Sequence, residues 1–208
     1  MLIALAGCDG AGKSTQTKEL LHRLLSKGYS VSMPDKWDVM SHDKFPECRF
    51  ITGDLKELKT CIADMEGVSR AMIFFWTLII TLSKENLSRP GHIYLLDGYW
   101  MKHAAGEIAL GVDRDWIMQT VQLMPVPDVT IYLDIPPEHA AKRKGQFTLM
   151  ECGRIRERSF ESFLAHQTRM REQLLQWCNE YNWNMISALQ DKSDVQTKID
   201  SILTPFLP

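Results

Sequence analysis

The chain has few of the features that mark secreted or membrane-spanning proteins. Its five cysteines are scattered over 208 residues without a C-x-x-C spacing. This odd, scattered set predicts reduced thiols and a cytoplasmic location. The N-terminus lacks the basic segment of a signal peptide. The longest nearly apolar run, residues 71–82, is too short to cross a bilayer and predicts a buried helix.

An excess of charge of one sign is also missing. The net charge is −2 and the isoelectric point is about 6.3, so no long-range attraction to nucleic acid or to a membrane is expected. We find no repeat, no low-complexity tract and no obvious linker. With 45% apolar residues, the chain is expected to form one domain over residues 1–208.

The most informative segment lies near the start of the chain. Residues 7–14 read G-C-D-G-A-G-K-S and follow the apolar run 2–6. The glycines allow backbone N–H groups to turn inward on a polyphosphate, and the N-terminus of the next helix attracts the anion. Lys13 brings a positive charge to the β- and γ-phosphates, and the Ser14 hydroxyl is a ligand for Mg²⁺. The motif predicts that ATP and Mg²⁺ are held by Gly7, Asp9, Gly10, Ala11, Gly12, Lys13, Ser14 and Thr15.

Strands and helices are predicted to alternate along the chain. We expect strands at 2–6, 29–33, 93–97, 129–134 and 183–188, and helices at 13–27, 55–64, 66–87, 116–123, from 136 onward, 159–181 and 195–203. Residues 35–52 read as an irregular segment. This order predicts an α/β fold of the three-layer P-loop NTPase type, with a parallel sheet of about five strands and helices on both faces.

Two carboxylates are expected near the phosphate loop. Asp97 ends the strand at 93–97, and ligands of such sheets bind beyond the carboxyl ends of the strands. We predict that Asp97 binds Mg²⁺ through water or orients the phosphate acceptor. The alternative is a strand-terminal aspartate that only forms a turn. Asp9, inside the loop, is predicted to contact a metal or an acceptor hydroxyl.

Basic residues gather late in the chain. They flank a segment with glycines near both ends, residues 145–153, and comprise Lys142, Arg143, Lys144, Arg154, Arg156 and Arg158. Such a segment predicts a lid over about 143–157 that closes on the transferring phosphoryl group and excludes water. Arginine suits this task because its fork matches phosphate oxygens. The alternative is a solvated helix pair with ordinary surface charges.

Together these motifs resemble thymidylate kinase, a nucleoside monophosphate kinase family, nearly from end to end. Residues 7–16 carry its phosphate loop, and residues 127–138, P-D-V-T-I-Y-L-D-I-P-P-E, are similar to its P-D-L-T-I-Y-L-D-V-P-P-E. Arg154-Ile155, followed by Phe160, resembles its lid.

The resemblance also implies roles for single residues. Members of the bacterial type have Gly at the position of Gly10 and take their catalytic arginine from the lid, which implies that role for Arg143 or Arg154. The family commonly forms homodimers through its helices, and residues 66–87 are the helix that would serve a homodimer here.

Departures from the family pattern fall on the acceptor side. The D-R-Y that ends a family strand, whose Arg grips the monophosphate, is Asp97-Gly98-Tyr99 here. The R-E-P-G loop becomes residues 34–37, P-D-K-W. The F-x-x-x-R helix, whose Phe stacks on thymine, becomes residues 72–78, which keep aromatic residues but no Arg. The candidate substrate residues are Lys36, Arg70, Phe74, Trp76, Tyr99, Lys102 and His103. Phe74 and Trp76 as core residues, and His103 as a surface residue, are the alternatives.

The donor side therefore matches the family and the acceptor side is altered. We expect a Mg²⁺-dependent transfer of the γ-phosphate of ATP to dTMP or a related pyrimidine monophosphate. One alternative is the same transfer to another small acceptor, such as an unusual nucleotide, a nucleoside or a specialised metabolite. The other is a non-catalytic nucleotide-binding protein.

Overall fold

Five short apolar strands form a parallel sheet at the centre of the molecule. The computed structural model describes residues 1–207. Within them the strands are β1 (Leu2–Ala6), β2 (Ser30–Ser32), β3 (His92–Asp97), β4 (Val129–Asp134) and β5 (Asn184–Ser187), in the order β2-β3-β1-β4-β5. All neighbouring pairs are parallel. The predicted α/β class and the sheet of about five strands are confirmed.

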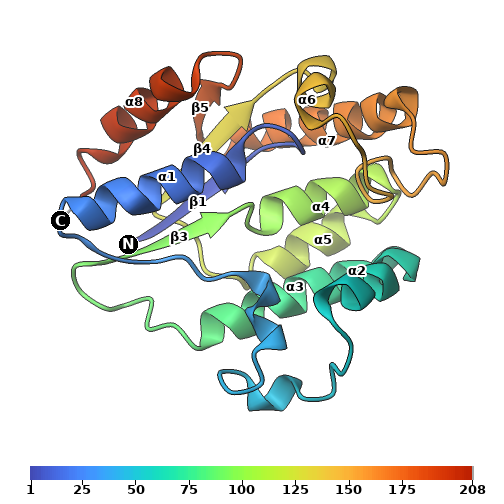
Figure 1. Cartoon of the computed structure of the whole chain (residues 1–208), viewed down its shortest axis with the longest axis horizontal. Helices are drawn as coiled ribbons and strands as arrows, with labels where there is room; N and C mark the ends of the chain where they lie inside the picture. The colour runs from blue at the N-terminus through green and yellow to red at the C-terminus, as the bar shows by residue number, and fades with distance from the viewer. Residues whose placement is uncertain (208) are drawn as a thin grey trace.

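Helices cover both faces of this sheet (Figure 1). The core on one face receives residues of α1 (Lys13–Ser26), α6 (Pro137–Lys144) and α8 (Lys192–Leu203). The core on the other face receives residues of α3 (Gly67–Ser83), α4 (Trp100–Ala109), α5 (Arg114–Val121) and α7 (Phe160–Glu180). Successive residues of β1 alternate between these cores, since Leu2, Ala4 and Ala6 lie in one and Ile3 and Leu5 in the other.

A small outer cluster lies beyond α3, outside the three layers formed by the sheet and the helices on its two faces. It contains the 3₁₀ helices η1 (Lys36–Met40) and η2 (Pro46–Cys48) and the helix α2 (Leu55–Asp64). Val39, Phe45, Cys48 and Ile51 form its own apolar cluster, with Trp76 of α3 packed against it. The segment predicted to be irregular, residues 35–52, thus contains two short 3₁₀ helices.

The strand register brings the predicted site residues to one edge of the sheet. Leu5 of β1 is paired with Asp97 of β3, and Ala6 is paired with Tyr132 of β4. The phosphate loop leaves β1 directly after Ala6 and therefore begins beside Asp97. The expected meeting of loop and carboxylate is explained by this register.

One helix was not predicted. Residues 100–109 form α4, which has no side-chain cap at its N-terminus. Six of its ten residues are buried, with His103 and Glu107 among them, so polar residues occupy core positions and interrupt the apolar pattern by which a helix is recognised in a sequence. The missed helix carries Lys102 and His103.

None of the helices in residues 1–207 has the length and the apolar character needed to span a membrane. The cytoplasmic location and the single domain over residues 1–208 stay predictions from the sequence.

Candidate active site

The phosphate loop depends on glycines at positions where a side chain does not fit. At Gly7, a Cβ would lie 2.7 Å from the carbonyl oxygen of Leu133. At Gly10, it would lie 2.9 Å from the carbonyl oxygen of Ala140, and φ is +82°. The loop therefore lies directly against β4 and α6. Gly12, with φ of +92°, turns the chain into α1.

The start of α1 presents free polar groups to this loop. Its N-cap is Gly12, which offers no side-chain acceptor, and its first turn contains no acidic residue. The first N–H groups of a helix have no partner within the helix and favour an anion. Lys13 is buried and its Nζ donates to the carbonyl oxygens of Gly7 and Cys8 at 2.8 and 2.7 Å. Burial, with Lys102 nearby, lowers the pKa of the Lys13 amine.

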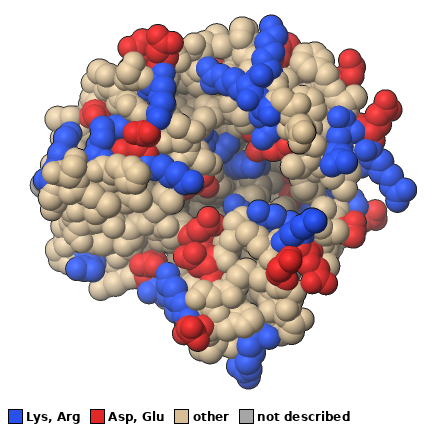
Figure 2. All heavy atoms as spheres, in the orientation of Figure 1, with Lys and Arg blue, Asp and Glu red and all other residues tan. Residues whose placement is uncertain are grey.

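A cavity of about 740 Å³, the first cavity, opens over the loop. Within the described residues its lining includes seven cationic side chains and three aspartates. The cations are Lys13, Lys18, Lys36, Lys102, Arg143, Lys144 and Lys192. Figure 2 shows this face, hollowed near its centre, with lysine and arginine atoms in and around the hollow. A chain with a net charge of −2 thus concentrates positive charge where a polyphosphate would bind.

The donor set in this cavity fits Mg²⁺. The Ser14 hydroxyl and the Asp97 carboxylate both line it, and hard oxygen ligands of this kind suit Mg²⁺. No group of three or more His, Cys, Asp and Glu side chains that would hold a metal occurs in residues 1–207. Mg²⁺ does not need such a cage, because it keeps several waters and shares its coordination with phosphates.

A second cavity of about 930 Å³ adjoins the first. It lies between α2, α3, α4, α7 and residues 148–151 of the segment predicted to be the lid, and its walls include Phe74, His103, Glu107, His166 and Met170. Four residues line both cavities, namely Asp9, Lys36, Trp37 and Lys102. These four residues form the junction between the two cavities.

An ion pair lies at this junction. Lys102 Nζ is 2.6 Å from Asp9 Oδ1. Burial alone would raise the pKa of the Asp9 carboxyl, but the charges of Lys102 and Lys13 outweigh it and hold that pKa well below its usual range. Burial would likewise lower the pKa of Lys102, and Asp9 more than offsets this. Both groups are therefore charged at neutral pH.

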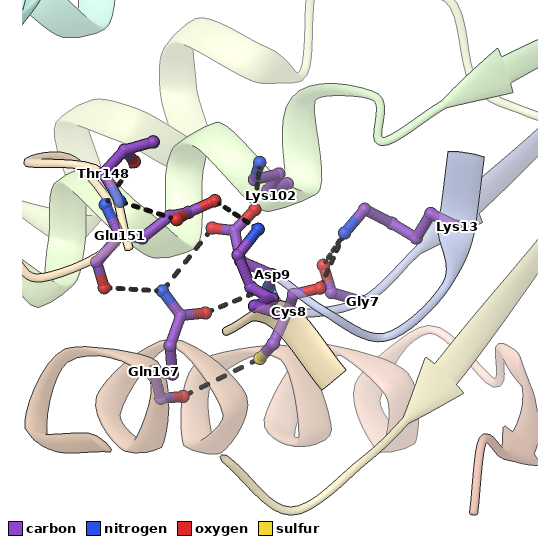
Figure 3. Close-up of polar contacts among 9 residues, drawn as sticks. Gly7, Cys8, Asp9, Lys13, Lys102, Thr148, Glu151 and Gln167 are labelled. Carbon is purple, nitrogen blue, oxygen red and sulfur yellow. Dashed lines mark hydrogen bonds and ion pairs between the residues drawn. The ribbon is translucent and has the colours of Figure 1, made fainter. Parts of the chain in front are cut away.

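Gln167 of α7 ties the phosphate loop to the lid (Figure 3). Its side chain is fully buried. Oε1 accepts from the backbone N–H of Asp9 at 3.0 Å, and Nε2 donates to the backbone carbonyl of Glu151 at 3.0 Å. Nε2 also lies 3.5 Å from Asp9 Oδ2. One amide group thus fixes Asp9 and the lid relative to each other.

The lid is held by contacts at both ends. At its start, Lys144 pairs with Glu151 at 2.8 Å, and the guanidinium of Arg143 donates to the Ala188 carbonyl at 2.6 Å. Near its end, Arg154 donates to the carbonyls of Ala63 and Asp64 on α2. Arg143 lines the first cavity, whereas Arg154 lines neither. Of the two predicted lid arginines, Arg143 alone lines one of these two cavities.

The predicted substrate residues divide into two groups. Lys36, Phe74, Tyr99, Lys102 and His103 line one or both cavities. Phe74 stacks on His103, with ring centroids 4.3 Å apart. His103 is buried, so the surface alternative for this residue is wrong. Tyr99 is also buried and donates its hydroxyl to the Pro125 carbonyl at 3.0 Å.

Arg70 and Trp76 line neither cavity. The Arg70 guanidinium donates twice to the Glu107 carboxylate, at 2.7 Å each, and once to the Met65 carbonyl. Trp76 packs against Phe50, with ring centroids 5.7 Å apart. Arg70 is therefore a buried partner of Glu107, and Trp76 packs against the outer cluster beyond α3. In both cases, contacts with other parts of the fold engage the side chain that was predicted from the sequence to bind a substrate.

Comparison with known proteins identifies the family of this chain. The family model described as thymidylate kinase matches residues 81–199, more than half of the chain. The chain belongs to the thymidylate kinase family. A probable thymidylate kinase 1 of Saccharolobus solfataricus is 27% identical over 93% of this chain and 92% of its own length. A probable thymidylate kinase of Archaeoglobus fulgidus is 30% identical over 69% and 68%. A putative thymidylate kinase 251L of Invertebrate iridescent virus 6 is 28% identical over 99% and 89%.

Family membership confirms the predicted enzyme class, a P-loop kinase of thymidylate kinase type. Sequence reasoning missed two residues of the site, Gln167 and Glu151. Gln167 occupies an apolar-face position of α7, between the buried residues Phe163 and Met170. A polar residue at a core position of an amphipathic helix was the available signal. Glu151 lies in the glycine-flanked segment, where only its cationic neighbours had suggested function.

Proposed function

We propose that this member of the thymidylate kinase family transfers the γ-phosphate of ATP to dTMP, with ATP in the first cavity and the acceptor in the second. The observation that carries the proposal is the junction formed by Asp9, Lys36, Trp37 and Lys102, which line both cavities. A phosphoryl group that passes between two bound nucleotides must cross such a junction. Its two lysines and one aspartate supply the charges that an in-line transfer requires.

Each loop residue then has a task. Backbone N–H groups of residues 7–14 hold the polyphosphate, and Lys13 exchanges its contacts with the Gly7 and Cys8 carbonyls for phosphate oxygens. Ser14 and Asp97 hold Mg²⁺, which offsets negative charge on the phosphates when it is bound. Arg143 stabilises charge on the transferring group from the lid side. Asp9 orients the acceptor phosphate through Lys102.

Position 98 holds Gly where the D-R-Y pattern has its arginine, and Lys102 is one of two lysines beside that position. A Cβ at Gly98 would lie 3.3 Å from Lys13 Cε and 3.7 Å from Lys102 Cδ. The space beside Gly98 thus already holds the stems of two lysines. We propose that Lys102 binds the acceptor monophosphate in place of that arginine, and that Lys36 does so for the arginine absent from residues 34–37.

Arg154 reaches the reaction centre only if it leaves its contacts with Ala63 and Asp64. Its predicted catalytic role is kept here as a proposal that requires movement of the lid. Its backbone is in the left-handed region, with φ of 64°, a conformation that few non-glycine residues adopt.

The altered acceptor side favours one further candidate, the same transfer to a different small acceptor. Lysine binds phosphate as a point charge and lacks the bidentate fork of arginine, so replacement of two arginines changes how the monophosphate is held. Incubation with ATP and Mg²⁺ against a panel of nucleoside monophosphates, nucleosides and water distinguishes the candidates by ADP release. Preference for dTMP supports the proposal, another preferred acceptor supports the second candidate, and hydrolysis or inactivity refutes both.

A homodimer through α3 is proposed as well. Val68, Met72 and Ile79 lie on one side of this helix and are each about half exposed, at 48%, 49% and 44%. Light scattering at micromolar concentration tests it: we expect a dimer for the natural chain and a monomer for Met72→Glu. A monomeric natural chain would contradict the proposal.

A further inference from the structure

A forked ion pair joins α7 to the end of strand β4. Arg171 of α7 donates from Nε and Nη2 to the two carboxylate oxygens of Asp134, the last residue of β4, at 2.7 and 2.8 Å. The buried Tyr132 donates its hydroxyl to Oδ1 of the same carboxylate at 3.0 Å. Two parallel hydrogen bonds between planar groups fix direction as well as distance. The pair therefore sets the position of α7 on the end of β4.

Gln167, which holds the phosphate loop, lies one helical turn before Arg171. Residues four apart on a helix lie on the same face, and strands β1 and β4 are paired neighbours in the sheet. Gln167 contacts Asp9 in the loop that follows β1, and Arg171 contacts Asp134 at the end of β4. One face of α7 is thus attached at two points to the ends of adjacent strands.

The contact between α7 and the loop leaves little room for the helix to shift. The Gln167 side chain accepts from the Asp9 N–H at 3.0 Å, and its backbone carbonyl lies 3.7 Å from Cys8 Sγ (Figure 3). A displacement of α7 by about 1 Å would take the first bond beyond hydrogen-bonding distance. Packed helices can slide past one another by small amounts, whereas a forked ion pair tolerates little displacement.

We propose that Arg171 and Asp134 are positioning residues of the kinase reaction. Their ion pair fixes α7 so that Gln167 holds the Asp9 backbone, and with it the phosphate loop, in the conformation that places ATP for transfer. The inference rests on the proposed function in one respect, the binding of ATP by that loop. Within residues 1–207, neither Arg171 nor Asp134 lines the two cavities, so they act through Gln167.

The test combines hydrogen–deuterium exchange of the ligand-free protein, steady-state kinetics and thermal unfolding. Arg171→Met removes the fork, and Arg171→Lys keeps the charge without the fork. The matched control, Arg114→Met, breaks the ion pair with Glu180 at the other end of α7, where the two charged atoms are 3.3 Å apart. The exchange measurement needs no substrate and therefore tests the inference separately from the proposed function.

We expect the Asp9 amide to exchange faster in Arg171→Met, about as fast as in Gln167→Met, while strand β1 stays protected. The kcat should fall about tenfold, since small misplacement of reacting groups is costly, and the KM for ATP should stay nearly unchanged. Addition of Gln167→Met should lower kcat little further, because both changes act on one contact. Arg171→Lys should lie between, and Arg114→Met should match the natural chain in loop exchange and kcat.

Natural exchange at Asp9 in the Arg171 variants, with lowered thermal stability, would show that the ion pair is only a structural link and would overturn the inference. Additive losses of kcat in the double variant would overturn it as well. Arg171→Lys decides the question if Arg171→Met does not fold. If the natural chain phosphorylates no acceptor of the panel, the proposed function fails, and the exchange at Asp9 still decides whether Arg171 positions the loop.

Discussion

Lys102 Nζ and Asp9 Oδ1 lie 2.6 Å apart at the junction of the two cavities. Asp9 comes from the loop after β1, and Lys102 comes from α4, the helix that follows β3. The pair therefore links the phosphate loop to the wall of the second cavity, and each partly buried side chain balances the charge of the other.

Replacing Lys102 by Met should weaken acceptor binding. The substitution leaves Asp9 as a partly buried, unpaired negative charge next to an anionic substrate, so we expect the KM for the acceptor to rise at least about tenfold and kcat to fall. Lys102→Arg keeps the charge and should retain most of the activity. Steady-state kinetics with varied acceptor measure both effects, and an unchanged KM in Lys102→Met would contradict the role of this lysine.

Replacing Lys13 by Ala should reduce turnover at least about a hundredfold, because a preorganised charge on the transferred phosphoryl group is lost. The fold should remain, since within residues 1–207 the hydrogen bonds of Lys13 Nζ go to carbonyls of its own loop, those of Gly7 and Cys8. Circular dichroism checks the fold, and Lys27→Ala, at the far end of α1, is the matched control. Near-normal turnover in Lys13→Ala would refute the assignment.

The acceptor kinetics should depend on the ionisation of Lys36. Burial, with Lys102 nearby, lowers the pKa of the Lys36 amine to about 8. The charged form is present below that pH and is lost as pH rises through it, so kcat/KM for the acceptor should fall above about pH 8. Lys36→Arg should move this decline to higher pH, since arginine stays protonated. Identical pH profiles for the two proteins would exclude Lys36 as its source.

Replacing Gln167 by Met should uncouple the lid from the loop. Met fills a similar volume but leaves the Asp9 N–H and the Glu151 carbonyl without partners. We expect the free energy of unfolding to drop by about 1–3 kcal/mol and kcat to fall about tenfold, with the KM for ATP nearly unchanged. Thermal unfolding and initial rates provide the two readouts. A variant that loses stability but keeps its kcat would show a purely structural role.

The pair of Arg70 and Glu107 should prove structural. Both side chains are almost fully buried, at 1% and 2% exposure, and removal of one partner strands a buried charge. Arg70→Met should therefore lower the free energy of unfolding by about 3–5 kcal/mol, and the double variant with Glu107→Leu should recover much of this loss. If Arg70→Met instead unfolds like the natural chain and raises only the acceptor KM, Arg70 is a substrate residue after all.

Local patterns in the sequence determined the donor half of this protein. These patterns are the G-x-x-x-x-G-K-S motif, the strand and helix that flank it, and Asp97 at a strand end. Each depends on neighbours along the chain or on a shared edge of the sheet. Backbone geometry and the parallel register therefore suffice to predict them, and residues 2–6 and 129–134 were placed with the observed bounds.

Only the tertiary structure decided the acceptor half. Whether a polar side chain faces a cavity or a buried partner depends on packing between distant elements, which no local pattern encodes. Arg70 is hydrogen-bonded to Glu107, which is 37 residues away in the sequence. Trp76 packs against the outer cluster. The Gln167 side chain bonds to Asp9, which is 158 residues away in the sequence, and to Glu151, which is 16 residues away. Charge and hydrogen-bonding capacity were readable from the sequence, but the partner that satisfies each group is a property of the folded chain.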